Sequence, residues 1–136
     1  MSPWLSLLGM ARKAGKVEIG EDALREAALS HRARLILLAR DAGESTAERV
    51  RRLEGEKLPV IETPADRAAL GGAVGFASAA ALAVTDLSFA SAIAARLAQE
   101  EPGLAEVSRE LAQRQEKARR RKADTLRHGR KSKRKQ

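Results

Sequence analysis

The sequence has no cysteine, and its aromatic residues are limited to one tryptophan and two phenylalanines. A chain without cysteine has no disulfides, no thiol nucleophile and no cysteine zinc site, and it fits a reducing compartment. The two histidines, His31 and His128, are far apart in the sequence and show no metal-ligand spacing. No metal or cofactor is therefore expected, and the core should consist of small and aliphatic side chains.

Strongly apolar runs of membrane-spanning length are also missing. The uncharged stretch from Ala68 to Thr85 consists mostly of alanine and glycine, whereas a span needs about 20 predominantly apolar residues. This stretch is predicted to form a buried helix, turn and strand. The short apolar run at the N-terminus is followed rather than preceded by charges, unlike a signal peptide. These features predict a cytoplasmic protein without a membrane partner.

Catalytic patterns are absent from the sequence as well. There is no P-loop motif, and the GGAVG segment at residues 71–75 follows a short helix rather than a strand, unlike a dinucleotide-binding turn. His31 stands among arginines at a helix end, where a histidine more often serves the helix dipole than catalysis. Asp41 follows an apolar strand and is interpreted as a loop residue that accepts hydrogen bonds from backbone N–H groups. Neither enzymatic activity nor a small-molecule substrate is predicted.

The spacing of apolar residues predicts alternating helices and strands. Helices are expected at residues 3–14, 21–30, 46–53, 64–70 and 87–99, and strands at residues 16–19, 33–40, 58–62 and 79–85. This alternation is typical of the α/β class, in which one sheet carries helices on both faces.

Capping signals mark the expected helix ends. Ser2 is predicted to cap the first helix and Gly15 to end it. Ser45 and Glu48 have the spacing of a capping box, and Asp86 is placed to cap the helix of residues 87–99. The short helix before the glycine-rich segment is expected to open at Thr63-Pro64.

The positive charge is concentrated at the C-terminal end. Residues 114–136 hold 12 basic and 2 acidic residues, a net charge of +10, while residues 1–113 carry −2. Pro102-Gly103 divides the chain into a predicted α/β domain at residues 1–101 and a C-terminal segment at 102–136. Residues 104–123 can form a charged helix whose apolar stripe ends at Leu111, and a basic tail that is disordered in isolation should follow.

The basic tail predicts a polyanionic partner. Clustered Lys and Arg side chains bind phosphates and release counterions, so that affinity falls as the salt concentration rises, but phosphate contacts do not read base sequence. Non-specific phosphate contacts are therefore expected from Arg119, Arg120, Arg121, Lys122, Arg130, Lys131, Lys133, Arg134 and Lys135. The alternative interpretation is a tail that only aids solubility.

Several segments, in this order, resemble a known family. They are LLGMARKAGKVEIGEDALREA, ARLILLARDAGEST, LPVIETPADRAALGGAVG and LAVTDLSFASAI, which together cover Leu5 to about Leu97. In order and spacing they resemble the ribosomal protein L-seven-Ae/L-thirty-e superfamily, in particular its small bacterial YlxQ-like branch. The resemblance implies a three-layer α/β/α sandwich with one mixed four-stranded sheet, and RNA binding without catalysis. Its typical ligand is the kink-turn, a sharply bent internal loop in RNA.

The resemblance also implies where RNA would be bound. Family members contact RNA through the start of the second helix and the loop before the last strand. In this chain the helix start supplies Gly20, Glu21, Asp22 and Arg25, and the loop supplies Phe76, Ala77, Ser78 and Ala79. Lys13 and Lys16, just before the first strand, add positive charge.

Three positions depart from the family pattern at the helix start. Asp22 falls where an asparagine is usual, Ala23 where a glutamate is usual, and Glu26 where a lysine is usual. An aspartate can accept a hydrogen bond from a guanine edge but cannot donate one, and a glutamate removes a phosphate contact. Arg25 points about 100° around the helix from Glu26.

Two functions of different classes follow. The first is an RNA-binding protein that recognises a structured RNA of the kink-turn or ribosomal type. The alternative is a protein–protein adaptor on a ribosome or RNA-processing complex, which would use the apolar loop and the helix at 104–113. The near-neutral domain and the acids at positions 21, 22 and 26 favour this alternative.

Overall fold

A computed structural model describes residues 2–135, with side chains described for residues 2–126. The helices are α1 (Pro3–Lys13), α2 (Glu21–Leu29), α3 (Glu44–Arg51), α4 (Arg67–Ala73), α5 (Leu87–Glu100) and α6 (Ala105–Lys135), with a short 3-10 helix η1 at Pro102–Leu104. The strands are β1 (Val17–Ile19), β2 (Leu35–Leu38), β3 (Val60–Glu62) and β4 (Ala81–Val84). Every predicted helix and strand of the α/β domain is present, mostly with narrower bounds.

The four strands form one mixed sheet in the order β1-β4-β2-β3. β4 pairs antiparallel with both β1 and β2, while β2 and β3 are parallel. Leu82 of β4 lies opposite Ile19 on one side and Leu37 on the other. The parallel pair places the first residues of β2 and β3 at the same edge of the sheet, and their last residues at the opposite edge.

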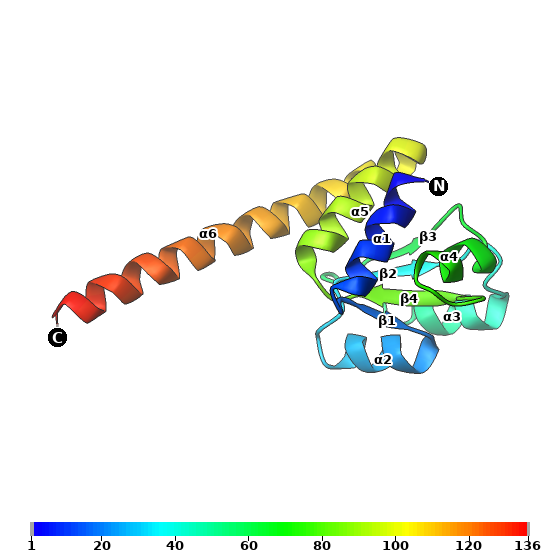
Figure 1. The fold of residues 1–136 in the computed structure, drawn as a ribbon, viewed down its shortest axis with the longest axis horizontal. Helices are drawn as coiled ribbons and strands as arrows, with labels where there is room; N and C mark the ends of the chain where they lie inside the picture. Colours follow the sequence, from blue (N-terminus) through cyan, green and yellow to red (C-terminus); the bar gives the residue numbers. More distant parts are fainter. Residues whose placement is uncertain (1, 136) are drawn as a thin grey trace.

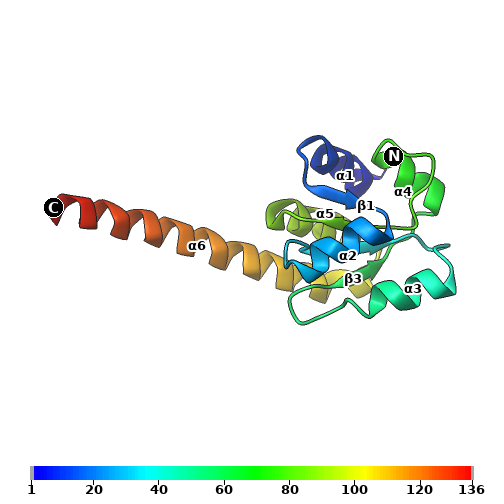
Figure 2. The ribbon, with the colours of Figure 1, turned by 90° about the horizontal axis from the view of Figure 1, so that it is seen from below.

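Helices cover both faces of the sheet (Figures 1 and 2). α1 packs against α4 and α5 on one face, and α2 lies against β1 and β4 on the other, next to α3. This is the predicted three-layer α/β/α sandwich. α6 starts against α5 and then extends away from the sandwich as a long helix (Figure 1).

The core is aliphatic, as the composition predicts. All residues of β2 and β4 are buried, which explains why these two strands read as continuous apolar runs. Trp4 is the one aromatic side chain among the described residues that is fully buried. Leu111 of α6 is also fully buried within the same cluster, so the start of α6 is packed into the core.

Two predicted helix starts are wrong. α3 begins at Glu44 after Gly43, without a side-chain cap, so Ser45 and Glu48 lie inside the helix and form no capping box. α4 begins at Arg67 and is capped by Asp66, whose carboxylate accepts a hydrogen bond from Ala69 N at 2.8 Å. Thr63 does not cap the helix. Its side chain is buried, and its hydroxyl donates a hydrogen bond to the carbonyl of Leu38 at 2.9 Å.

Other capping predictions have mixed outcomes. Ser2 makes no side-chain cap to α1, whereas Asp86 caps α5 by accepting from Phe89 N at 2.9 Å. Asp41 accepts a hydrogen bond from Arg67 N at 2.8 Å, which confirms its interpretation as a loop residue that satisfies the backbone.

The C-terminal helix continues further than the sequence predicts. The apolar stripe ends at Leu111, yet α6 runs on to Lys135, well beyond the expected end at Ala123. Lys, Arg, Gln and Glu are good helix formers, so the backbone can continue as a helix without burial. Disorder of the tail in isolation and the division of the chain at residue 101 remain predictions, and Leu111 extends the core across that division.

Candidate nucleic-acid interface

Gly20 forms the junction between β1 and α2. Its backbone has φ +94° and ψ 158°, a conformation that L side chains rarely adopt. Its N–H donates to Ala81 O at 3.2 Å, and its carbonyl accepts from Leu24 N at 3.0 Å. A Cβ at this position would meet no atom within 4 Å. The glycine is therefore required by the backbone conformation, and the space beside it is open to a ligand.

The loop before β4 lies beside this junction, because Gly20 is hydrogen-bonded to the first residue of that strand. Within the loop, Phe76, Ala77 and Ser78 are exposed and Ala79 is buried. The loop is held against α4, since a Cβ on Gly71 would come within 2.7 Å of the Ser78 backbone. The fold thus brings together the two segments that the resemblance places at the RNA-binding surface.

Phe76 is the exposed apolar side chain of this loop. Its side chain is 46% exposed, and the guanidinium of Arg12 from α1 stands over the ring, 6.0 Å from its centroid. This distance is at the limit of a cation–π contact. An exposed ring next to an arginine offers a stacking surface for an unpaired base.

The acids at the start of α2 have different partners. Glu21 accepts two hydrogen bonds from Arg49 of α3, at 2.6 and 2.9 Å, and this arginine holds the pKa of Glu21 below its ordinary value. Glu26 is paired with Arg32, which also reaches Glu18 at 3.4 Å. Arg32 in turn has its pKa raised by the Glu26 and Glu18 carboxylates. Two of the three acids are therefore neutralised locally.

Asp22 and Arg25 are the charged side chains that remain at the helix start. Both are exposed, and neither forms an ion pair among the described side chains. They are free to contact a ligand, with one charge of each sign.

Lys16 lies away from this surface. It precedes β1 while Gly20 follows it, so the two residues occupy opposite ends of the strand. The carbonyl of Lys16 accepts from Thr85 N at 2.9 Å, and Arg34 N donates to Val84 O at 2.8 Å, which places Lys16 and Arg34 along one edge. Lys13 ends α1 next to Arg12, whose guanidinium stands over Phe76. The fold therefore separates Lys16 from Gly20 by the length of β1.

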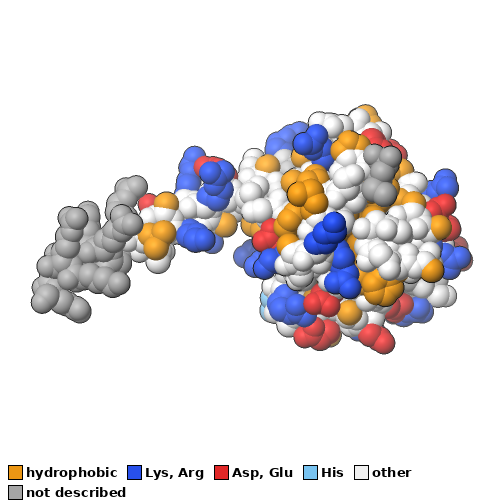
Figure 3. Space-filling view, viewed as in Figure 1, with side chains coloured by type: hydrophobic (Ala, Val, Ile, Leu, Met, Phe, Trp, Pro, Cys, Tyr) orange, Lys and Arg blue, Asp and Glu red, His pale blue; other side chains and the backbone are white. Residues whose placement is uncertain are grey.

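The basic residues of the tail fall into two groups. Arg119, Arg120, Arg121 and Lys122 are exposed on α6, and Arg120 pairs with Glu116 at 3.2 Å. The side chains predicted to contact phosphates at positions 130–135 lie outside the described side chains. Figure 3 shows several basic side chains on the described part of α6, whereas acidic and basic side chains are interspersed over the visible face of the domain.

Sequence reasoning named Arg121 as a phosphate contact but missed the other basic residues that join it at the Lys16 edge. Arg34, Lys57, Arg114, Lys117 and Arg121 line one cleft between the sandwich and α6. The spacing of positions 114, 117 and 121 marks one face of a helix and could have been read from the sequence. Arg34 and Lys57 could not, because only the parallel pairing of β2 and β3 brings the segments before these strands together.

Other kinds of site find no support in the part of the chain that the structure describes. It contains no group of three or more His, Cys, Asp or Glu side chains that could hold a metal ion. No described helix is long and apolar enough to cross a membrane.

Comparison with known proteins identifies the family. The chain is 38% identical over 89 residues to the RNA-binding protein YlxQ of Bacillus subtilis, a match that covers 65% of this chain and 88% of that protein. The chain belongs to the YlxQ-like family. No protein-family model matches it.

Solved structures agree with the YlxQ-like fold. A Bacillus halodurans protein described as having unknown function is 31% identical, with a TM-score of 0.67 over 71% of this chain and 98% of that one. The 15.5kD RNA-binding protein of Giardia lamblia is 15% identical, with a TM-score of 0.58 over 74% of this chain and 86% of that one. At this identity the second likeness concerns the fold alone.

Proposed function

We propose that the protein is a non-catalytic RNA-binding protein that recognises a structured RNA. The observation that carries this proposal is the 38% identity to a protein named as RNA-binding, over 88% of that protein's length. The geometry around Gly20 supports it, because the fold places an open helix start beside an exposed loop. A cytoplasmic location and a place on the ribosome or an RNA-processing complex belong to the same proposal.

The start of α2 supplies the main recognition element. The helix begins without a side-chain cap, so its first backbone N–H groups remain available to a phosphate or a base edge. Gly20 has no side chain to obstruct the approach. Arg25 adds a cation, Asp22 can accept from a base amine, and Phe76 adds a stacking surface. Recognition therefore depends mainly on the shape of the RNA.

The departures at positions 22, 23 and 26 bear on the identity of the RNA. Glu26 is occupied by Arg32 and supplies no phosphate contact. Asp22 repels phosphate but accepts a hydrogen bond from a base amine. We therefore propose a ligand of the kink-turn or ribosomal type whose backbone passes to one side of Glu26.

A glycine comparison tests this proposal. Gly20 and Gly43 are both helix N-caps with similar backbones, at φ +94° and +91°, which an L side chain would strain, and a Cβ added at either position would meet no atom within 4 Å. Either change to alanine should cost about 1–3 kcal/mol of stability. Gly20→Ala should in addition weaken binding to a kink-turn RNA more than Gly43→Ala does, as measured by gel shift.

The outcomes of this comparison are distinct. A wild-type protein that binds neither a kink-turn nor other structured RNAs would contradict RNA binding itself. Equal RNA affinities for the two alanine variants would place the binding surface elsewhere on the protein.

The adaptor alternative loses one of its two surfaces in the structure. Of the apolar residues at 104–113, Leu111 is fully buried, and Leu104 and Val107 pack against the core. This stripe anchors α6 to the sandwich and is not available to a partner protein.

A further inference from the structure

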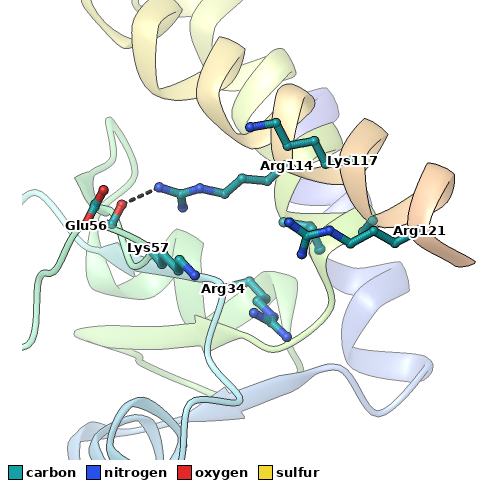
Figure 4. Close-up of a pocket in the computed structure, with 8 residues that line it drawn as sticks. Arg34, Glu56, Lys57, Arg114, Lys117 and Arg121 are labelled. Atoms are coloured by element: carbon teal, nitrogen blue, oxygen red, sulfur yellow. Dashed lines mark hydrogen bonds between the residues drawn. The ribbon is translucent and has the colours of Figure 1, made fainter.

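The strongest concentration of unpaired positive charge lies in the cleft between α6 and the sheet edge that carries Lys16. We call it the α6 cleft and define it by Arg34, Lys57, Leu87, Arg114, Lys117 and Arg121, with Glu56 and Ala118 completing its lining. Its volume is about 370 Å³. Figure 4 shows Arg34, Lys57, Arg114 and Arg121 around one hollow, from three separate segments, with the guanidinium of Arg114 turned toward Glu56.

The positive charge in the cleft is largely uncompensated. Most other described arginines of the domain have a carboxylate partner, such as Arg49 with Glu21 and Arg51 with Glu62. Arg34, Lys57 and Arg121 form no ion pair among the described side chains. Five basic side chains line the cleft against one acid. Mutual repulsion of this kind is relieved by a bound anion.

One cleft residue is fixed by the sandwich. The guanidinium of Arg114 donates to the backbone carbonyl of Glu56, which ties α6 to the loop before β3. Leu111 is buried one turn earlier on the same helix. The positions of Lys117 and Arg121 are therefore set by the anchored start of α6 and not by its free C-terminal end.

The cleft continues along the surface in both directions. A neighbouring hollow of about 350 Å³ shares Arg34 and Lys57 and adds His31, and another of about 270 Å³ shares Arg114 and Lys117 and adds Glu110. The cations shared by these hollows all belong to the cleft itself, and they come from three segments of the chain, an arrangement that can contact successive phosphates of a backbone. The exposed large hydrophobic side chains of the described chain lie elsewhere, at Met10, Leu29, Phe76 and Leu126, so the cleft offers no anchor to a membrane or an apolar partner.

We propose that the α6 cleft is a second RNA-contacting site that takes the phosphates of an RNA backbone, at the opposite edge of the sheet from Gly20. This inference rests on the proposed RNA-binding function. The two sites differ in chemistry, because the Gly20 edge offers open backbone N–H groups and balanced charge, whereas the α6 cleft offers five cations against one acid. The cleft strengthens binding without selecting sequence.

Matched double variants test this site in the full-length protein. Arg34→Gln with Arg121→Gln removes two cations from the cleft. Arg96→Gln with Arg109→Gln removes two exposed arginines that do not line it and have no ion pair among the described side chains. Affinity for a kink-turn RNA and for a plain RNA duplex is measured between about 50 and 200 mM salt. Thermal unfolding checks that both variants are folded.

The cleft variant should lose two phosphate contacts. Its plot of log affinity against log salt should be shallower than that of the wild type by about 1.4–1.8 on both RNAs. The ratio of wild-type to variant affinity should then shrink by roughly tenfold across this salt range, while the control variant keeps a slope close to the wild type. If the double cleft variant is unstable, Lys57→Gln alone should reduce the slope by about 0.7–0.9.

Three results would overturn the inference, and they are distinguishable. Equal slopes for cleft and control variants, with normal wild-type binding, reject the cleft while leaving the proposed function intact. Saturable ATP binding that is lost in the cleft variant, together with unchanged RNA binding, would assign the cleft to a free phosphate ligand. A wild-type protein that binds no RNA rejects the proposed function and this inference with it.

Discussion

Arg49 of α3 holds both carboxylate oxygens of Glu21 at the start of α2, with Nε at 2.6 Å from Oε2 and Nη2 at 2.9 Å from Oε1. The pair joins two helices on the same face of the sheet. It also neutralises the charge of Glu21, one of the acids at the helix start that would otherwise repel the phosphates of an RNA. The pairing keeps the pKa of Glu21 below its ordinary value, with the hydrogen bond from Arg49 as the main cause.

Replacing Arg49 by glutamine should raise the pKa of Glu21 toward its ordinary value. A carboxylate whose pKa is lowered in the folded protein contributes stability above its ordinary pKa, and this contribution is lost as the pH falls through the lowered pKa. The variant should therefore lose less stability on acidification than the wild type. An NMR titration of the Glu21 carboxylate and unfolding curves at acidic pH would check both effects.

The same variant should bind a kink-turn RNA several-fold more weakly at neutral pH, because an uncompensated carboxylate then faces the ligand. Arg51→Gln is the control, since this arginine is also on α3 but pairs with Glu62 at 3.9 Å, at the end of β3. Equal effects of the two substitutions would show that only net charge matters.

Gly71→Ala should destabilise the protein by about 1–3 kcal/mol. The new Cβ would lie 2.7 Å from backbone atoms of Ser78, so that α4 and the loop before β4 must move apart. Gly72→Ala is a matched control in the same helix with no atom within 4 Å, and it should stabilise the protein by about 0.4–1 kcal/mol. Urea unfolding of both variants measures the difference, and an equal response would contradict the close contact.

Leu111→Ala should cost about 2–5 kcal/mol, because it leaves a cavity where α6 enters the core. Leu126→Ala, which changes a side chain that is 59% exposed on the same helix, should stay within about 0.5 kcal/mol of the wild type. Denaturant unfolding provides the comparison. A small loss for Leu111→Ala would mean that α6 is not anchored in the core and that the division near residue 101 is a true domain boundary.

Truncation after Lys122 separates the tail from the α6 cleft. It removes 6 basic residues and 1 acidic residue but leaves every cleft residue in place. Affinity for all RNAs should fall by a similar factor and the salt dependence should flatten, while the preference among RNAs is kept. Salt-dependent gel shifts on two RNAs would test this, and an unchanged salt slope would exclude phosphate anchoring by the tail.

Much of the fold could be predicted because local patterns and burial agree. The continuous apolar runs of β2 and β4 identify buried strands, and Asp86 caps α5 as its position suggests. The cap at Thr63 failed because a tertiary contact overrode local preference, and the box at Ser45 failed because a neighbouring glycine starts the helix earlier. Thr63 is buried and hydrogen-bonded to Leu38 O, and Gly43, at a φ of +91°, starts α3 before the box.

Only part of the candidate site could be predicted from the sequence. Gly20 and the loop before β4 were predicted together and do lie together, through the bond from Gly20 N to Ala81 O. Lys16 is four residues from Gly20 in the sequence, yet it lies at the other end of β1. Proximity along an extended strand does not mean proximity in space, because each residue advances the chain by about 3.3 Å.

The sequence by itself determined the class of the fold, the positions of its elements, the family and the basic character of the C-terminal segment, because these depend on local periodicity and composition. Only the tertiary structure decided which charges are free. It paired Glu21 with Arg49 and Glu26 with Arg32, and it gathered Arg34, Lys57 and Arg121 into one cleft. The Glu21–Arg49 pair and the cleft depend on distances between residues that are remote in the sequence, and those distances are set by the packing of the helices and the order of the strands.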